Sequence, residues 1–109
     1  RHFIYLDAHW LDHLPLREEL HIIFGQMPRS VVMVDDFQVP DDSGYGYDDY
    51  GPGKALTPAY LKDLATPFST FFPVAAARWE TGAKRGCVVL TADNALREVL
   101  DNLPCLRRA

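Results

Sequence analysis

“SVVMVDDFQVP”, residues 30–40, is the stretch that decides the fold of this 109-residue chain. Residues 31–34 are unbroken and largely β-branched, which is typical of a strand that is buried on both faces. The stretch then turns acidic at Asp35 and Asp36. It therefore predicts a buried strand that brings two carboxylates to the rim of a sheet.

A second strand and a helix are predicted upstream of this stretch. Residues 2–8 are mostly apolar and include Asp7 near their end. Pro15 suits the first turn of a helix, which Gly25 and Pro28 would end. Apolar residues recur at helical spacing in between: Leu16, Leu20, Ile23 and Phe24. A strand, a helix and a strand within about 35 residues form one βαβ unit, so we expect two parallel strands and a right-handed crossover.

The second half of the chain is predicted to contain a helix and then two strands. Residues 57–65 have helical character, with Thr57 as a candidate cap and Pro58 at the first helical position. Strands are predicted over residues 68–79 and 87–92. Their connection is short, so we expect an antiparallel hairpin.

The end of the chain completes the predicted order of elements. Pro73 favours an edge position for the third strand, because proline cannot donate a ladder hydrogen bond. A last helix is predicted over residues 93–103, with Asp93 as its cap. The order is therefore β-α-β-α-β-β-α. We expect an α/β fold in a single unit of residues 1–109, with a partial Rossmann-like sheet, parallel first strands and a closing antiparallel hairpin.

The composition excludes several classes of function. The net charge is −4 and the only basic cluster is Arg107-Arg108, so we expect no nucleic-acid partner. No apolar run approaches the roughly 18 residues of a membrane span, and no signal peptide is visible, so we expect a cytoplasmic protein without a membrane partner. Cys87 lies in an apolar run and is interpreted as a buried thiol. Arg1 stands at the start of a strand, which indicates a fragment of a longer chain.

Three carboxylates are predicted to meet at one edge of the sheet. Ligands of open α/β sheets gather at the carboxyl ends of the strands. Asp7, Asp35 and Asp36 end two strands that, as neighbours, would lie about 4.8 Å apart. Like charges at that range repel, whereas a hard cation such as Mg²⁺ takes carboxylate ligands. We therefore interpret the three acids as Mg²⁺ ligands; the alternative is that Asp35 and Asp36 only turn the chain after a strand.

His9 is the candidate catalytic base, because it lies two residues beyond Asp7 and its unperturbed pKa is about 6.5. The alternative is a rim histidine that bonds a neighbour. His9 and His13 also have the spacing of a helical zinc pair, but “HWLDH” lacks the glutamate of that motif and Pro15 places the helix later.

Residues 40–54, “PDDSGYGYDDYGPGK”, are predicted to form a loop. Gly53-Lys54 resembles part of a phosphate-binding loop, but neither the following Ser or Thr nor the required earlier glycine is present. The tyrosines and glycines suit a mobile lid over the acidic rim. A solvated surface loop is the alternative.

These residues together resemble the second half of a class I S-adenosylmethionine-dependent methyltransferase. The resemblance lies in “FIYLDAHW” (residues 3–10), the helix after it and “SVVMVDDFQVP”, and it is strongest for metal-dependent small-molecule O-methyltransferases, including the cephalosporin-hydroxylase-like enzymes. In that family two strands end in acids that hold Mg²⁺, and the fold closes with an antiparallel pair of strands. The resemblance implies that Asp7, Asp35 and Asp36 are metal ligands and that His9 lies near the place of the base.

The resemblance also implies that the chain is the C-terminal half of a larger enzyme. That family binds the methyl donor through a glycine-rich turn after its first strand and an acid after its second, and this chain has neither. We therefore assign no donor-binding residue and expect the isolated chain to be inactive. The implied cofactors are Mg²⁺ and S-adenosylmethionine, and the implied acceptor is a small-molecule hydroxyl. The exposed first strand would be an open edge through which copies of the chain could associate.

Two other classes remain open. “VVMVDDF” (residues 31–37) resembles the acidic pair of a phosphorelay receiver and “VVLTA” (residues 88–92) its threonine-bearing strand, but no lysine follows Thr91 and the preceding strand ends without an aspartate. Phosphorylation by a small phosphodonor would identify a receiver. The other class is a non-catalytic α/β interaction module, which the lack of any response to Mg²⁺ would favour.

Overall fold

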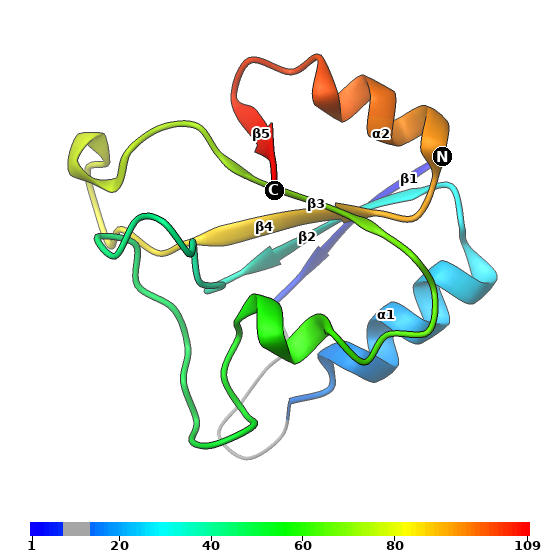
Figure 1. Ribbon diagram of the computed structural model, residues 1–109, viewed down its shortest axis with the longest axis horizontal. Helices are drawn as coiled ribbons and strands as arrows, with labels where there is room; N and C mark the ends of the chain where they lie inside the picture. The colour runs from blue at the N-terminus through cyan, green and yellow to red at the C-terminus, as the bar shows by residue number, and fades with distance from the viewer. Residues whose placement is uncertain (8–13) are drawn as a thin grey trace.

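The computed structural model describes residues 1–7 and 14–109 of the chain (Figure 1). Within these ranges one mixed α/β unit contains a five-stranded open sheet and two α-helices. The strands are β1 (His2–Leu6), β2 (Ser30–Asp35), β3 (Ser69–Pro73), β4 (Cys87–Thr91) and β5 (Leu106–Arg108). The helices are α1 (Leu16–Gln26) and α2 (Asn94–Asp101), with two short 3-10 helices, η1 (Pro58–Leu61) and η2 (Ala77–Trp79).

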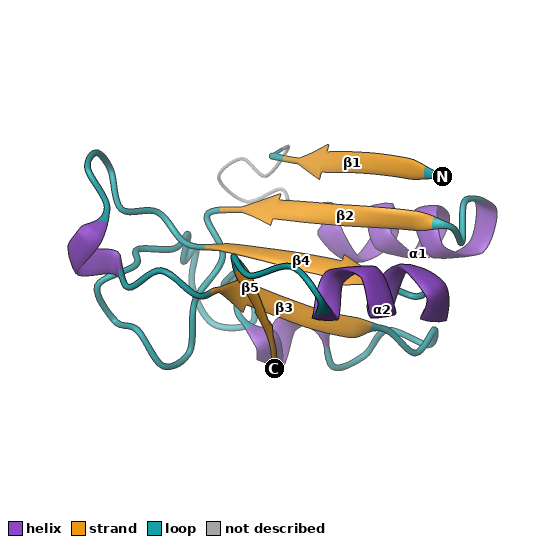
Figure 2. Cartoon of the chain, turned by 90° about the horizontal axis from the view of Figure 1, so that it is seen from above, coloured by secondary structure: helices purple, strands orange, loops and turns teal. Residues whose placement is uncertain are grey.

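The strands lie in the order β1-β2-β4-β3-β5, and Figure 2 shows the first four side by side in this order. β1 pairs with β2 in parallel, with His2 opposite Ser30 and Leu6 opposite Val34. β4 runs antiparallel to both β2 and β3. The parallel first pair and the antiparallel pairing of the third and fourth strands were expected from the sequence, and both are confirmed. The expected short connection between the latter two is wrong, because residues 74–86 separate β3 from β4 and include η2.

Each face of the sheet is covered by one helix, and Figure 1 shows α1 and α2 on opposite sides. On one face Val32, Val34 and Leu90 are fully buried and belong to a core cluster that includes the apolar side of α1. On the other face Phe71 and Val89 pack with Leu100 of α2. The side-chain alternation of a strand produces these two faces.

The first and the last of the predicted helices are confirmed as α1 and α2, with small shifts at their ends. The four residues that carry the helical period in α1 are all buried: Leu16, Leu20, Ile23 and Phe24. Asp93 caps α2, because its carboxylate accepts the backbone N–H of Leu96 at 2.8 Å. α1 continues through Gly25 and ends at Gln26.

The predicted helix over residues 57–65 is wrong, because only the four residues of η1 form a 3-10 turn. Pro58 takes the predicted first position, but the Thr57 side chain makes no capping bond. The carbonyl of Tyr60 accepts the Arg17 guanidinium at 2.9 Å instead. Pro67 further disfavours helix at the residue before it. A short turn bonded to α1 therefore replaces the helix.

The predicted edge position of the third strand is also wrong, because β5 lies outside β3 and pairs with it from Phe71 to Pro73. The pairing between β3 and β4 ends at Phe71, so Pro73 needs no donor on that side. The strand is shorter than the predicted range 68–79. β5 has only three residues, two of them arginines, which is how proteins often protect a sheet edge.

No helix in the described ranges combines the length and the apolar character that crossing a bilayer requires.

Candidate metal centre

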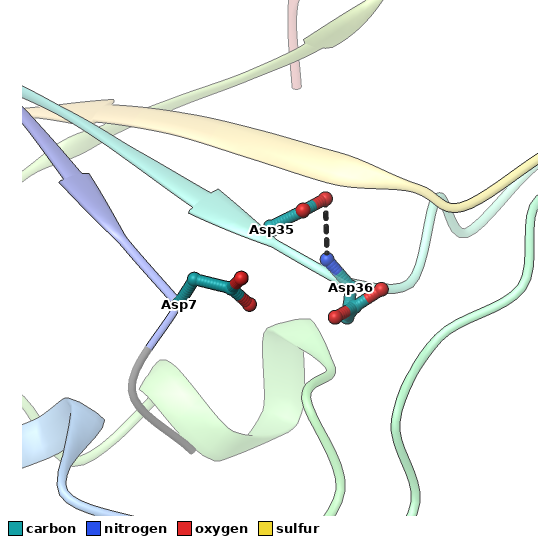
Figure 3. Close-up of side chains that lie close together, drawn as sticks. All are labelled: Asp7, Asp35 and Asp36. Atoms are coloured by element: carbon teal, nitrogen blue, oxygen red, sulfur yellow. Dashed lines mark hydrogen bonds between the residues drawn. The ribbon is translucent and has the colours of Figure 1, made fainter.

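Three acids meet at the carboxyl ends of β1 and β2. Asp35 is the last residue of β2 and Asp36 follows it, while Asp7 directly follows β1. Because Leu6 lies opposite Val34 in a parallel pair, Asp7 and Asp35 extend from neighbouring strands at the same end. One carboxylate oxygen from each acid lies within 4.8 Å of those of the other two (Figure 3). The sequence prediction that these residues converge is confirmed.

A left-handed turn at Asp36 brings the second acid of the pair into the cluster. Asp36 has a φ of 55°, which is uncommon for a residue other than glycine. Its backbone N–H donates to Asp35 Oδ1 at 2.9 Å, the dashed line in Figure 3. Successive side chains of a strand otherwise point to opposite faces of the sheet. Because β2 ends at Asp35 and the chain turns at Asp36, the carboxylates of both residues can lie in the same cluster.

Tyr5 belongs to the cluster although the sequence did not suggest it. Its hydroxyl donates to Asp35 Oδ2 at 2.5 Å. This hydrogen bond, with partial desolvation and the negative charges of Asp35, Asp7 and Asp36, raises the pKa of Tyr5 to about 12. The phenol therefore remains a neutral donor at physiological pH and fixes the orientation of one carboxylate.

Arg85 supplies positive charge from the segment before β4, whose first residue, Cys87, lies opposite Asp35. Its Nε donates to Asp36 Oδ1 at 2.6 Å, and a second guanidinium nitrogen pairs with Asp48. The bond to Asp36 raises the pKa of Arg85. Tyr50 in turn donates to Asp48 Oδ2 at 2.9 Å. Arg85 thus offsets part of the repulsion among the acids, and it ties the loop of residues 40–54 to the site.

The spacing of the carboxylates is compatible with a divalent cation. Oxygen ligands on opposite sides of Mg²⁺ lie about 4.2 Å apart, and those around Ca²⁺ about 4.6–5.2 Å apart. The distances between the three carboxylate oxygens all lie within 4.8 Å, which is the range that the ligands of either ion span. Asp7 is exposed and the other two acids are half-buried, so water could complete the coordination. The donor set is all hard oxygen, which fits either ion.

The remaining predicted site features are placed as follows. His9 and His13 lie outside the described residues, so neither the base nor the zinc alternative is tested.

In the loop of residues 40–54, Tyr45 is buried and its hydroxyl donates to the Ala75 carbonyl at 2.8 Å. The loop is also bonded at Gly46 to the segment before β4. Part of this predicted lid is therefore packed into the core.

Comparison with known proteins adds no family to this geometry. No protein-family model, no curated protein and no solved structure matches the chain.

Proposed function

We propose that this chain is the metal-binding part of an S-adenosylmethionine-dependent, Mg²⁺-assisted methyltransferase that acts on a hydroxyl of a small molecule. The observation that carries the proposal is the convergence of Asp7, Asp35 and Asp36 from the ends of two parallel strands. Three carboxylates within 4.8 Å repel one another unless positive charge balances them. Arg85 balances part of this charge, and a divalent cation would balance the rest.

The arrangement of the sheet supports the same proposal. The methyltransferase resemblance implies parallel strands that carry the acids and an antiparallel pair that closes the fold. β1 and β2 are parallel, and β4 is antiparallel to β3. In this proposal the fold is the C-terminal half of a Rossmann-like sheet, with the acids at its ligand-binding rim.

Each residue of the cluster has a defined task in the proposed reaction. Asp7, Asp35 and Asp36 hold the cation, which when bound would orient a substrate hydroxyl and lower its pKa. Tyr5 and Arg85 are positioning residues, because each bonds one of these carboxylates. His9 is the proposed base that accepts the hydroxyl proton. The oxygen would then attack the methyl group of S-adenosylmethionine in line, so that the new C–O bond forms as the C–S bond breaks and S-adenosylhomocysteine leaves, with proximity supplying much of the acceleration.

We assign the methyl-donor site to residues outside this chain. The sequence contains no glycine-rich turn between a strand and a helix to hold the donor. The 109-residue chain alone is therefore expected to bind the cation but not to transfer a methyl group. The gene upstream of Arg1 tests this assignment. A strand, a glycine-rich turn and a helix encoded there would support it, and a start codon directly before Arg1 would contradict it.

Calorimetric titration with MgCl₂ tests the metal-binding part of the proposal. We expect saturable binding to the wild-type chain and its loss in Asp7→Asn, which keeps the shape of the side chain but removes its charge. Asp63→Asn is the matched control, because Asp63 is an exposed acid whose partner is Arg17 on α1. If the wild-type chain does not bind Mg²⁺, the interaction-module alternative is favoured.

A further inference from the structure

A polar cavity of about 380 Å³ lies between the segment that leads into β3, the turn after β4 and the first turn of α2. Its polar lining residues are Thr66, Ser69, Thr91, Asp93, Asn94 and Arg97. Thr91 ends β4 opposite Val31 and Ser69, where β2 and β3 begin, whereas the candidate metal ligands lie where β1 and β2 end. Figures 1 and 2 show the start of α2 at the same end of the sheet as the start of β2. The cavity shares no residue with the candidate metal centre, so an inference about it does not rest on the proposed function.

Arg97 carries an enclosed N–H group without a hydrogen-bond partner. Its Nε is the only shielded side-chain nitrogen or oxygen in residues 1–7 and 14–109 that has no partner. A buried donor without a partner costs free energy, and an apolar side chain of similar size avoids this cost. The terminal nitrogens of the guanidinium are not shielded in this way, and within the same ranges they bond no acid or carbonyl. The cation of Arg97 is therefore available to a ligand that enters the cavity.

Asp93 does not neutralise Arg97, although it lines the same cavity. It stands four positions before Arg97, which is a spacing at which opposite charges pair along a helix. Its carboxylate instead caps α2 by accepting the N–H of Leu96 at 2.8 Å. No ion pair joins the two side chains in the part of the chain that the structure describes. The cavity thus contains a cation that no neighbouring acid holds.

Further hydrogen-bond donors line the cavity. The hydroxyls of Thr66 and Ser69 and the amide of Asn94 have no protein partner among the described residues. Thr91 differs, because its hydroxyl donates to the Ser30 carbonyl at 2.8 Å. The first N–H groups of a helix have no partner within the helix, and they add positive potential at the start of α2. These groups together favour an anionic ligand with several oxygen atoms.

We propose that this cavity binds a phosphate group, carried either by the free ion or by the monoester of a small molecule. The oxygen atoms of a phosphate group can accept bonds from the guanidinium, the two hydroxyls and the amide at once, whereas a carboxylate has fewer oxygen atoms and leaves some donors unpaired. Arginine suits phosphate because its planar N–H groups can donate two parallel bonds. Small-molecule pockets measure about 300–1,000 Å³, so the cavity also has room for the organic part of a monoester. The charge of Asp93 opposes the anion and limits its affinity.

Calorimetric titration with three probes tests the class of ligand. Inorganic phosphate, phenyl phosphate and benzoate are added separately to the chain, in a buffer that contains neither phosphate nor added metal. We expect at least one phosphate probe to bind saturably and benzoate to bind at least about tenfold more weakly. The tighter of the two phosphate probes identifies whether the free ion or a monoester is the preferred source. Comparable binding of benzoate, or no saturable binding of either phosphate probe, would overturn the proposal.

Two substitutions in the cavity have opposite expected effects on the tighter phosphate probe. Arg97→Met removes the cation and keeps an unbranched side chain, so the probe should bind about tenfold or more weakly. Asp93→Asn keeps a good capping group. It removes the opposing charge, so the probe should bind about fivefold more tightly. A gain of affinity cannot arise from loss of the fold, so this second variant tests the site independently of stability.

Matched controls for the two substitutions lie away from the cavity. Arg78→Met changes an exposed arginine in η2, and Asp101→Asn changes the last residue of α2, which pairs with Arg108. Neither control should alter the affinity for the probe. The proposal would be overturned if Arg97→Met and Arg78→Met weakened binding equally, or if Asp93→Asn did not tighten it relative to Asp101→Asn.

Discussion

At the scale of single residues, the acidic cluster depends on donors that come from distant parts of the chain. Arg85 bonds Asp36 across 49 positions of sequence, and Tyr5 bonds Asp35 across 30. Both bonds compete with a cation for the same carboxylates, yet both also hold those carboxylates in place. The balance between these two effects determines how tightly a divalent ion binds.

Arg85→Met separates the two effects. The substitution removes two partly exposed ion pairs, so the free energy of unfolding without metal should fall by about 1 kcal/mol. It also removes a positive charge next to the site, so Mg²⁺ should bind about fivefold more tightly. Urea denaturation and calorimetry measure the two quantities, with the exposed Arg78→Met as control. Weaker Mg²⁺ binding would contradict this prediction and would mean that the positioning of Asp36 by Arg85 outweighs its competition with the cation.

The raised pKa of Tyr45 predicts that the stability of the fold depends on pH in the alkaline range. Burial, followed by the charge of Glu80, raises the pKa of this tyrosine. Above about pH 10 the unfolded chain loses the phenolic proton while the folded chain keeps it. The unfolded state then binds fewer protons, so the free energy of unfolding decreases as the pH rises through the raised pKa.

Denaturation of wild type and Tyr45→Phe between neutral pH and the alkaline limit checks this effect. The variant loses the hydrogen bonds to Ala75 and Glu80 and should be about 1 kcal/mol less stable at neutral pH. Its stability should nevertheless fall less steeply above about pH 10. If the free energy of unfolding fell equally steeply with pH in both proteins, Tyr45 would not contribute to the alkaline loss of stability.

At the scale of elements, the sequence predicts those helices and strands that form from local patterns, and it fails where contacts between distant residues decide the structure. β2 was predictable because its apolar run is unbroken and largely β-branched, and α1 because its apolar residues recur at helical spacing. Residues 57–65 have a helical pattern, but contacts with Arg17 and the position of Pro67 override it. β5 has only three residues and forms because β3 offers it an edge, which no local pattern reports.

At Gly86 the segment before β4 lies very close to the backbone of Phe37, so this position has no room for a side chain. It precedes β4, and its carbonyl accepts the N–H of Phe37 at 3.0 Å. A Cβ at this position would lie 2.1 Å from the Phe37 carbonyl oxygen. Gly86→Ala should therefore lower the free energy of unfolding by about 1–3 kcal/mol.

Gly25→Ala is the matched control for this substitution. Gly25 lies in α1, is exposed, and has nothing within 4 Å of a Cβ built on it. Alanine should therefore stabilise the helix by about 0.5–1 kcal/mol. Urea denaturation of both variants measures the difference, and a similar effect of the two substitutions would contradict the close approach.

At the scale of the whole molecule, the site is assembled by topology. The convergence of Asp7 with Asp35 and Asp36 could be predicted because parallel strands end at the same edge of a sheet. Arg85 and Asp48 could not, since they lie in irregular segments whose positions depend on the packing of the complete chain. The sequence therefore predicted the acids of the candidate site but missed the residues that hold them.

The most direct test of the central claim is a magnesium titration followed by the side-chain carboxylate resonances of the aspartates. Our account predicts that Asp7, Asp35 and Asp36 shift together and saturate with one dissociation constant, while the exposed Asp63 and Asp101 do not saturate. Equal, non-saturating shifts at all five aspartates, or no shift at the three acids, would contradict a shared cation site at the ends of β1 and β2.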